Sequence, residues 1–357
     1  MEQAEDTTII EGADPKIVGP YLADQLGDPI WRDSDVRLLS GGKSNLTYLV
    51  SARGRELVLR RPPLGHVLPT AHDMQREFEV ISALAPTAVP VPKALHLCTD
   101  PNILGVTFYA MERCHGHIVR NKFPRGFAPD PADKRKVGEG LIDALVDLHA
   151  VDWRSIGLQE FGRPDGFMER QIRRWARQWE SSVTRPLPLM DDLIARLEQD
   201  LPESPAPTIV HGDFRLDNAI LDPTEVGRIR AILDWEMSTI GDPLADLGLM
   251  LVYWPQENDS DAYRSAFESI TATSVPGFPT RDDVLQRYAA KSGRDASGVY
   301  FYWAFGFFKL AVILEGIHAR YLQGKTLGEG FEGIGDRVPP LIMASMWALE
   351  RKEVGPI

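Results

Sequence analysis

Hydrophobic residues change their spacing near residue 116, and this change predicts two parts in the chain. Between residues 36 and 61, the runs LTYLV and ELVLRR flank the polar SARGR, which is typical of a β-hairpin. Residues 72–84 carry apolar positions at helical spacing, and GVTFYAMERC (105–114) is another strand-like run. We therefore predict a small β-rich lobe over residues 35–112 that combines these strands with one helix.

After residue 116 the pattern becomes mainly helical. Residues 137–148 carry one apolar stripe, and residues 165–200 are expected to form a helix with long charged faces. The runs NAILD and IRAILDW flank PTEVGR and predict a second hairpin, and nearly all of the chain after Pro243 is expected to be helical. These patterns predict an α+β protein whose larger lobe, residues 113–357, is mostly helical, with a helical extension over residues 1–34 before the small lobe.

The composition is that of a globular protein, with 43% hydrophobic and 25% charged residues in a chain of 357. A net charge of −12 argues against nucleic acid or a membrane surface as the main partner, although it allows a local basic pocket for a phosphorylated ligand. The acidic, polar start of the chain predicts no signal peptide, and Cys98 and Cys114 fit no metal-binding spacing. We therefore expect free thiols and a cytoplasmic protein.

The most apolar stretch covers residues 299–317 and contains Lys309 and Glu315. Because a bilayer disfavours such charges, we interpret this stretch as a buried helix and not as a membrane span. Its aromatic side chains are expected mainly in the core, with a few left to line an apolar slot.

The stretch IVHGDFRLDNAILD (209–222) places an aspartate and an asparagine five residues apart on a polar loop between two apolar runs. The run AILDW places Asp234 at the end of a strand, sixteen residues after Asn218. Phosphoryl transfer needs a carboxylate near the acceptor hydroxyl and oxygen ligands for Mg²⁺. Asp213 can act as the base while Asn218 and Asp234 hold the metal; a plain polar turn is the alternative for the loop taken alone.

Two further elements can supply the nucleotide half of such a site. The turn GGKSN (41–45) offers backbone N–H groups and the Ser44 hydroxyl to phosphates, although a plain hairpin has the same pattern. Arg60 in LVLRR offers a cation on a strand, and QREFEV offers acids on the next helix. The alternative is an exposed ion pair, worth about 0–1 kcal/mol. Val58 shares the strand face of Arg60 and is predicted to line an adenine pocket.

These motifs resemble those of the aminoglycoside phosphotransferase-like kinases, which are relatives of the protein kinases. Over roughly residues 35–325 the chain contains GGKSNLTY, VLRRPP, HGDFRLDN, LDWEMSTIGDPLADL and FYWAFGFFKLAVILEGIHARY. In these motifs it is similar to the branch that forms the kinase domain of acyl-CoA dehydrogenase family members ten and eleven. The resemblance implies a two-lobed protein-kinase-like fold and a Mg²⁺-dependent phosphotransferase that uses ATP or GTP.

The resemblance also implies roles for individual residues. Asp213 matches the catalytic aspartate that positions the acceptor hydroxyl, and Asn218 and Asp234 match the magnesium ligands. Arg60 stands where most kinases carry a lysine, and Glu77 fits the helix glutamate that pairs with this cation. The implied nucleotide-binding set, in which the last three residues match the hinge between lobes, is Gly41, Gly42, Ser44, Asn45, Val58, Arg60, Glu77, Met111, Glu112 and Cys114.

Other residues near these motifs are expected to support the loop or to indicate the substrate class. We interpret His211 as bonding the loop backbone and not as a proton shuttle, and Asp246 as holding the shape of the loop. Asp242 is expected to cap the helix that follows it. Trp235 and Glu236 stand in place of the Phe-Gly of a protein-kinase Asp-Phe-Gly motif, and no Ala-Pro-Glu follows, which argues against a protein substrate.

The resemblance indicates a hydroxyacyl-CoA as acceptor, in particular a 4-hydroxyacyl-CoA. Basic residues in HIVRNKFPRG (117–126) and Arg173 with Arg174 are either ligands of the CoA phosphates or solvated surface charges. Two alternatives stay open: a kinase for another hydroxylated metabolite or antibiotic, such as an aminoglycoside, choline or a sugar, and a non-catalytic nucleotide-binding module. The choice between monomer and homodimer also stays open.

Overall fold

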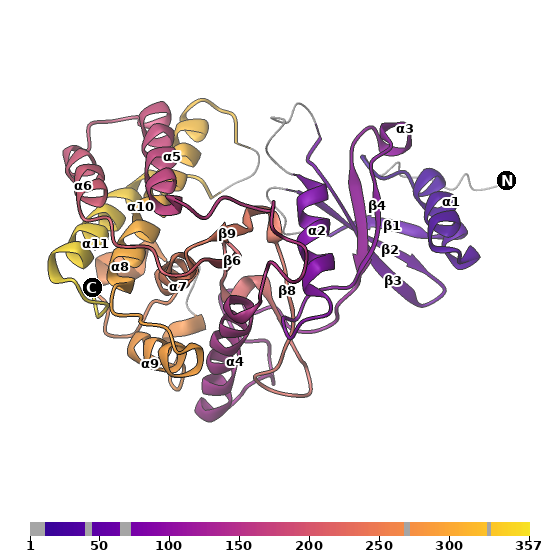
Figure 1. Ribbon diagram of the computed structural model, residues 1–357. Helices are drawn as coiled ribbons and strands as arrows, with labels where there is room; N and C mark the ends of the chain where they lie inside the picture. The colour runs from indigo at the N-terminus through magenta and orange to yellow at the C-terminus, as the bar shows by residue number, and fades with distance from the viewer. Residues whose placement is uncertain (1–10, 40–44, 65–72, 268–271, 327–329) are drawn as a thin grey trace. The chain divides into compact units, whose positions relative to one another are not determined.

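Two structural units make up the chain. The computed structural model describes residues 11–39, 45–64, 73–267, 272–326 and 330–357. Unit 1 is Met1–His115 with Leu233–Glu236, and unit 2 is Gly116–Ile232 with Met237–Ile357 (Figure 1). Unit 1 therefore includes the N-terminal extension and a short segment from much later in the chain. The predicted phosphate-turn residues Gly41, Gly42 and Ser44 lie outside the described residues.

Unit 1 is built on an antiparallel sheet with the strand order β1-β2-β3-β5-β4. Its strands are β1 (Asp35–Leu38), β2 (Leu46–Ala52), β3 (Arg55–Arg61), β4 (Ala94–Cys98) and β5 (Phe108–Glu112). The first predicted hairpin is confirmed: Ala52 pairs with Arg55 across a turn in which Arg53 and Gly54 have φ angles of 48° and 82°. Strand β4 is not predicted by the pattern, because its half-buried residues follow a proline-rich run and do not alternate.

Helices cover both faces of this sheet (Figure 1). Helix α1 (Pro15–Leu26) packs on one face through Val18 and Leu22, which join Trp31 and side chains of β2, β3 and β5 in one core. Helix α2 (Met74–Leu84) packs against β4 and β5 on the other face. Asp73 caps α2 by accepting hydrogen bonds from backbone N–H groups of its first turn, which also contains Glu77. A 3₁₀ helix, η1 (Pro29–Asp33), and the short α3 (Pro101–Leu104) complete the helices of this unit.

Unit 2 is mostly helical, as the pattern predicts. Its helices are α4 (Pro131–Ala150), α5 (Phe167–Ser182), α6 (Pro188–Gln199), α7 (Pro243–Val252), α8 (Asp261–Ala266), α9 (Arg281–Ser292), α10 (Val299–Leu322) and α11 (Val338–Arg351). The single helix predicted over residues 165–200 is wrong, because α5 ends at Ser182 and α6 begins at Pro188. Pro186 and Pro188 have no backbone N–H group and cannot continue the preceding helix.

The apolar helix α10 packs against α5, α7 and α11 at the centre of unit 2 (Figure 1). Among the helices in the described residues, α10 alone is long and apolar enough to cross a membrane, and 78% of its apolar stretch is buried inside the protein. The interpretation of residues 299–317 as a buried helix is therefore confirmed. Most of its aromatic side chains lie in the core.

Two short sheets position the loops of unit 2. Strand β6 (Thr208–Val210) pairs with β9 (Thr239–Gly241), and β7 (Ala219–Leu221) pairs with β8 (Ile229–Ile232), which confirms the second predicted hairpin. Because Val210 lies opposite Thr239, the loop that starts at His211 begins beside the segment leading to α7.

Candidate active site

Glu77 is the centre of a buried polar cluster in unit 1. The residue is 1% exposed, and its carboxylate accepts hydrogen bonds from Tyr109 Oη at 2.8 Å and from Asn45 Nδ2 at 2.8 Å. Arg60 Nε lies 3.0 Å from Glu77 Oε2, while Arg60 Nη2 donates to Asp234 Oδ1 at 3.1 Å. The guanidinium group therefore reaches two carboxylates at once, which a single ammonium group does less readily.

The Arg60–Glu77 pair is not the exposed ion pair that the sequence left as an alternative. Burial would lower the pKa of Arg60, but Tyr109, Glu77 and Asp234 outweigh it and hold that pKa above its ordinary value. Burial raises the pKa of Glu77, and the Arg60 charge opposes this rise. Because burying both charges is costly, the pair depends on the hydrogen bonds that surround it.

Asp234 is held in an uncommon backbone conformation. Its φ angle is 69°, in the left-handed region that few residues other than glycine adopt, although aspartate tolerates it better than most. The residue follows β8 in the chain and precedes a 3₁₀ turn, Trp235–Met237. In the same segment Glu236 Oε2 accepts a hydrogen bond from Asn45 Nδ2 at 2.9 Å. Asp234 and Glu236 are thus both tied to side chains of the unit 1 sheet.

The predicted adenine-contacting residues lie on neighbouring strands of unit 1. Val58 on β3 is paired with Met111 on β5, and both side chains are buried. Glu112, the last residue of β5, donates its backbone N–H to the Lys93 carbonyl at 2.9 Å. Cys114 is half-buried and forms no disulfide bond among the described residues. Contact of Val58, Met111, Glu112 and Cys114 with adenine stays a prediction.

In unit 2, the loop of residues 211–218 is organised around Asp213. Asn218 Nδ2 donates to the Asp213 carbonyl at 2.8 Å and to Asp213 Oδ2 at 3.0 Å, so the amide Oδ1 points away from that carboxylate. Arg215 Nε lies 3.2 Å from Asp213 Oδ2 and 3.1 Å from Asp217 Oδ1. The Asp213 side chain is 22% exposed. The loop therefore presents a carboxylate that is fixed by donors and still accessible.

The backbone of this loop is held by Asp246 of α7. The side chain of Asp246 is fully buried; its Oδ2 accepts from His211 N at 2.6 Å and its Oδ1 from Gly212 N at 2.8 Å. His149 Nε2 lies 3.5 Å from Asp246 Oδ2. Burial opposes the Asp246 charge, but His149, His211 and the backbone bond hold the pKa of Asp246 below its ordinary value. Burial lowers the pKa of His149, and the hydrogen bond and charge of Asp246 oppose this fall.

His211 and Asp242, which lie beside this loop, also accept hydrogen bonds from neighbouring residues. His211 Nδ1 accepts a hydrogen bond from Asp213 N at 3.2 Å. Asp242 caps α7 by accepting from Leu244 N at 3.0 Å, as predicted, and it also accepts a hydrogen bond from the Tyr302 hydroxyl. Burial raises the pKa of Asp242 to about 6.

Asp217 is another acidic residue of this loop, and its side chain is 30% exposed. Burial raises the pKa of Asp217, and Arg215 opposes that rise. The Arg215 guanidinium also lies 4.7 Å from the centre of the Tyr253 ring, a cation–π distance. Arg215 is therefore fixed by Asp213, Asp217 and Tyr253 together.

Sequence reasoning missed Lys309 as a residue of this region. Its Nζ donates to the Gly212 carbonyl at 2.9 Å, directly before Asp213 in the chain, and the residue is 8% exposed. The sequence did contain one signal, a lysine inside an apolar run. A buried charge needs a polar partner, so such a lysine is expected to contact a polar group. That signal did not identify the partner, which lies 97 residues away.

The proposed metal ligands offer oxygen atoms of the kind that Mg²⁺ prefers. Asp234 supplies a carboxylate and Asn218 supplies an amide oxygen, and both fit a hard cation that also binds phosphate oxygens. In the described residues no group of three or more His, Cys, Asp or Glu side chains could hold a metal ion alone. Each of the two donors suits Mg²⁺ by its chemistry, and their joint binding of the ion stays a prediction.

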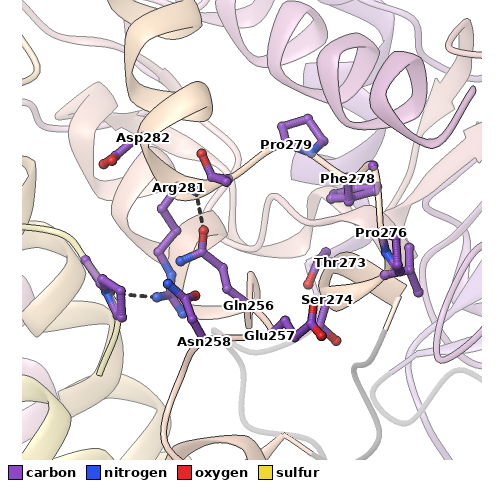
Figure 2. Close-up of a pocket in the computed structure, with 15 residues that line it drawn as sticks. Gln256, Glu257, Asn258, Thr273, Ser274, Pro276, Phe278, Pro279, Arg281 and Asp282 are labelled. Atoms are coloured by element: carbon purple, nitrogen blue, oxygen red, sulfur yellow. Dashed lines mark hydrogen bonds between the residues drawn. The ribbon is translucent and has the colours of Figure 1, made fainter. Parts of the chain in front are cut away.

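A cavity in unit 2 lies apart from all the predicted site residues. It has a volume of about 580 Å³ and is lined by residues 256–258, 273–282, 355 and 356 (Figure 2). Figure 2 shows Arg281 N bonded to Gln256 Oε1 at its wall. Because no predicted site residue lines this cavity, we assign the chemistry to the polar clusters and not to the cavity.

The fold and these clusters define a small-molecule phosphotransferase with a kinase-like architecture. A family model described as "Phosphotransferase enzyme family" matches residues 35–279. The chain belongs to this family, whose members phosphorylate hydroxyl groups of small molecules.

Several known proteins are similar to this chain. Mouse acyl-CoA dehydrogenase family member 10 is 36% identical over 86% of this chain and 28% of its own length. Rat acyl-CoA dehydrogenase family member 11 is 37% identical over 84% of this chain and 38% of its own length. The chain therefore spans only about a third of these relatives.

A solved structure supports the same fold over nearly the whole chain. It is a Ralstonia eutropha protein proposed to be an aminoglycoside phosphotransferase, with a TM-score of 0.80 and 31% identity over 95% of this chain and 98% of that chain. The aminoglycoside phosphotransferase APH(4)-Ia, solved with ADP and hygromycin B, has a TM-score of 0.57 at 15% identity over 95% of this chain and 99% of its own. The predicted α+β kinase-like fold is confirmed.

Proposed function

We propose that this protein is a Mg²⁺-dependent kinase that transfers the γ-phosphate of ATP to a hydroxyl group of an acyl-CoA, in particular a 4-hydroxyacyl-CoA. The accessible Asp213 carboxylate, fixed by Asn218 and Arg215, is the observation that carries the chemistry. The acceptor is supported by relatives whose names contain acyl-CoA dehydrogenase and which are 36–37% identical to most of this chain.

In the proposed reaction, the acceptor oxygen forms a bond to the γ-phosphorus while the bond from that phosphorus to the bridging oxygen breaks and ADP leaves. The hydroxyl proton passes to the Asp213 carboxylate and then to solvent. Asn218 and Asp234 would hold the Mg²⁺ ion, which neutralises phosphate charge when bound. Arg60 would bind phosphate oxygens, and Glu77 would keep its guanidinium group oriented.

The charges around the Asp213 loop favour a neutral or anionic acceptor over a polycation. Arg215 lies between Asp213 and Asp217, and Lys309 interacts electrostatically with both Asp213 and Asp246. An aminoglycoside carries several positive charges and needs acids that have no cation beside them. Asp213, Asp217 and Asp246 each already have a cation nearby, so none of these carboxylates is left over to pair with an ammonium group of such a substrate.

The test is Mg²⁺-dependent ADP release in the presence of 4-hydroxyacyl-CoAs of several chain lengths. We expect release that requires the acceptor, and we expect Asp213→Asn to lower kcat by about 10²–10⁴-fold without loss of ATP binding. Asp191→Asn, an equivalent change at an exposed position of α6, serves as the control. Unchanged turnover in Asp213→Asn would refute the mechanism, and no release with any acyl-CoA would refute the acceptor.

A second candidate is phosphorylation of an aminoglycoside. It is favoured by the match to the Ralstonia eutropha protein, which covers 95% of this chain at 31% identity. Aminoglycosides, choline and sugars therefore belong in the same ADP-release assay. Turnover of an aminoglycoside at a higher kcat/KM than any hydroxyacyl-CoA would replace the first proposal with this one.

A further inference from the structure

Two buried donors beside the Asp213 loop have fewer acceptors than they can use. An ammonium group has three N–H donors, and in the described part of the chain the Gly212 carbonyl is the one hydrogen-bond acceptor of Lys309 Nζ. The indole Nε1 of Trp175 is buried and has no hydrogen-bond partner among the described residues. An unsatisfied buried donor is unfavourable and calls for an explanation.

These two donors belong to the same side-chain cluster of unit 2. Lys309 is on α10 and Trp175 is on α5, and these helices pack together. Lys309 Nζ lies 5.6 Å from the centre of the Trp175 ring, and the two residues are 8% and 9% exposed. Since Lys309 bonds to the residue directly before Asp213, the cluster lies at the loop that carries the proposed catalytic carboxylate.

We propose that Lys309 and Trp175 form a binding subsite for a carbonyl or carboxylate oxygen of the acceptor. This inference rests on the proposed kinase function and specifies which acceptors the site selects. An oxygen bound there accepts hydrogen bonds from the ammonium group and the indole N–H while a hydroxyl group of the same molecule reaches Asp213. A hydroxyacyl chain has both oxygens a few carbons apart, whereas a polycation presents amines that Lys309 repels.

A purely structural role for Lys309 explains these observations less well. Tying α10 to the Gly212 carbonyl needs only a neutral donor, and a buried ammonium group costs more to desolvate than an amide. Burial lowers the pKa of Lys309, and Arg174 and Arg215 add to this effect, while Asp213 and Asp246 oppose it. A ligand oxygen would instead account for both geometric observations, the single acceptor of Lys309 Nζ and the buried Trp175 N–H that has no partner among the described residues.

The test combines two variants with acceptors that differ only in the oxygen group. Lys309→Gln removes the charge and keeps an N–H donor on a side chain that is one bond shorter, and Trp175→Phe keeps an aromatic ring but removes the N–H. The acceptors are a 4-hydroxyacyl-CoA, the N-acetylcysteamine thioester of the same acid, the free 4-hydroxy acid, and an alcohol of equal length without a carbonyl. Lys136→Gln, in an exposed ion pair, and Trp179→Phe, on the same helix α5, are the matched controls.

We expect Lys309→Gln to raise KM for the carbonyl-bearing acceptors about 10- to 100-fold, the effect of losing a charged hydrogen bond, and Trp175→Phe to raise it by a smaller factor. KM for ATP and KM for the plain alcohol should stay unchanged. A larger effect on the free acid than on the thioesters identifies a carboxylate as the natural ligand, and the reverse identifies a thioester carbonyl. Equal loss for all acceptors, or a change in KM for ATP, would show a structural role and overturn the proposal.

Binding measurements separate this inference from the proposed function. The dissociation constant of each acceptor is measured by calorimetry with AMP-PNP present, where no transfer occurs. Weaker binding of carbonyl-bearing acceptors to Lys309→Gln supports the subsite even if wild type shows no turnover, in which case only the proposed function fails. Equal binding to wild type and Lys309→Gln, or no binding to wild type, overturns the subsite.

Discussion

Asp246 offers a direct test of how the Asp213 loop keeps its shape. In Asp246→Asn one carboxylate oxygen is replaced by an NH₂ group, which cannot accept a hydrogen bond. Either His211 N, in a fully buried residue, or Gly212 N, in a half-buried residue, then loses its acceptor. The lost charged hydrogen bond and the unsatisfied donor together predict a cost of about 3 kcal/mol to the free energy that keeps the loop closed.

The assay is native-state hydrogen exchange of the amides of His211 and Gly212, measured together with kcat. A cost of about 3 kcal/mol corresponds to exchange roughly 100-fold faster at these amides. We expect kcat to fall as well, because the Asp213 carboxylate follows directly after Gly212. Exchange in α1 of unit 1 should not change.

Asp242→Asn is the matched control, since it neutralises another buried aspartate at the start of the same helix. Asparagine caps helices about as well as aspartate, so the bond from Leu244 N is retained. We expect a cost below about 1 kcal/mol and no change in loop exchange. If Asp242→Asn and Asp246→Asn give the same exchange rates, or if exchange in Asp246→Asn rises less than fivefold, the role assigned to Asp246 is refuted.

Three further predictions concern pH, backbone and ion pairing. The pKa of Asp242 in the folded protein is about 6, above its ordinary value of 3.8, so folding takes up a proton at this carboxyl group. The stability of wild type relative to Asp242→Asn should therefore be greatest below about pH 4 and should fall as the pH rises through 6. A difference in Tm that does not change with pH would contradict this prediction. Gly212→Ala, at φ 83° and with its Cβ 2.6 Å from a backbone oxygen, should lose nearly all turnover and lower Tm; wild-type kinetics would be inconsistent with the loop geometry. Glu77→Gln should lower the free energy of unfolding of unit 1, measured in urea, by about 3 kcal/mol, because it leaves Arg60 without a buried carboxylate partner. The control Glu139→Gln, in an exposed pair, should cost less than about 1 kcal/mol. Equal costs for the two variants would contradict the assigned role of Glu77.

The parts of the fold that the sequence predicts are those with a strong local pattern. The β2–β3 hairpin follows from alternation around a glycine turn, and α10 follows from a long apolar run. Strand β4 has no such pattern. It lies at the edge of the sheet and is held there by pairing with β5, so its strand conformation depends on tertiary contacts and not on its own sequence. The break between α5 and α6 was marked by two prolines, a local signal that the helical charge pattern of residues 165–200 obscured.

The same distinction applies to the candidate site. A cation on a strand followed by an acid on the next helix predicts the Arg60–Glu77 pair, and the structure places the two groups 3.0 Å apart. The support from Tyr109 and Asn45 could not be predicted from spacing, because Tyr109 lies on β5 and Asn45 directly precedes β2, both distant from Glu77 in the sequence. Lys309 and Trp175 lie on helices whose packing brings together residues more than 100 positions apart, which no local pattern contains.

The assignment of Leu233–Glu236 to unit 1 limits how this protein can be divided or recombined. A fragment that ends at His115 would contain the whole sheet but would lack Asp234, a partner of Arg60, and Glu236, a partner of Asn45. Exposed apolar and charged groups would then be left where this segment belongs, so we expect such a fragment to aggregate or to gain stability when a peptide containing residues 233–236 is added. For the same reason, a chimera with a relative that exchanges the sheet must also exchange these four residues, although more than a hundred positions of unit 2 separate them in the chain.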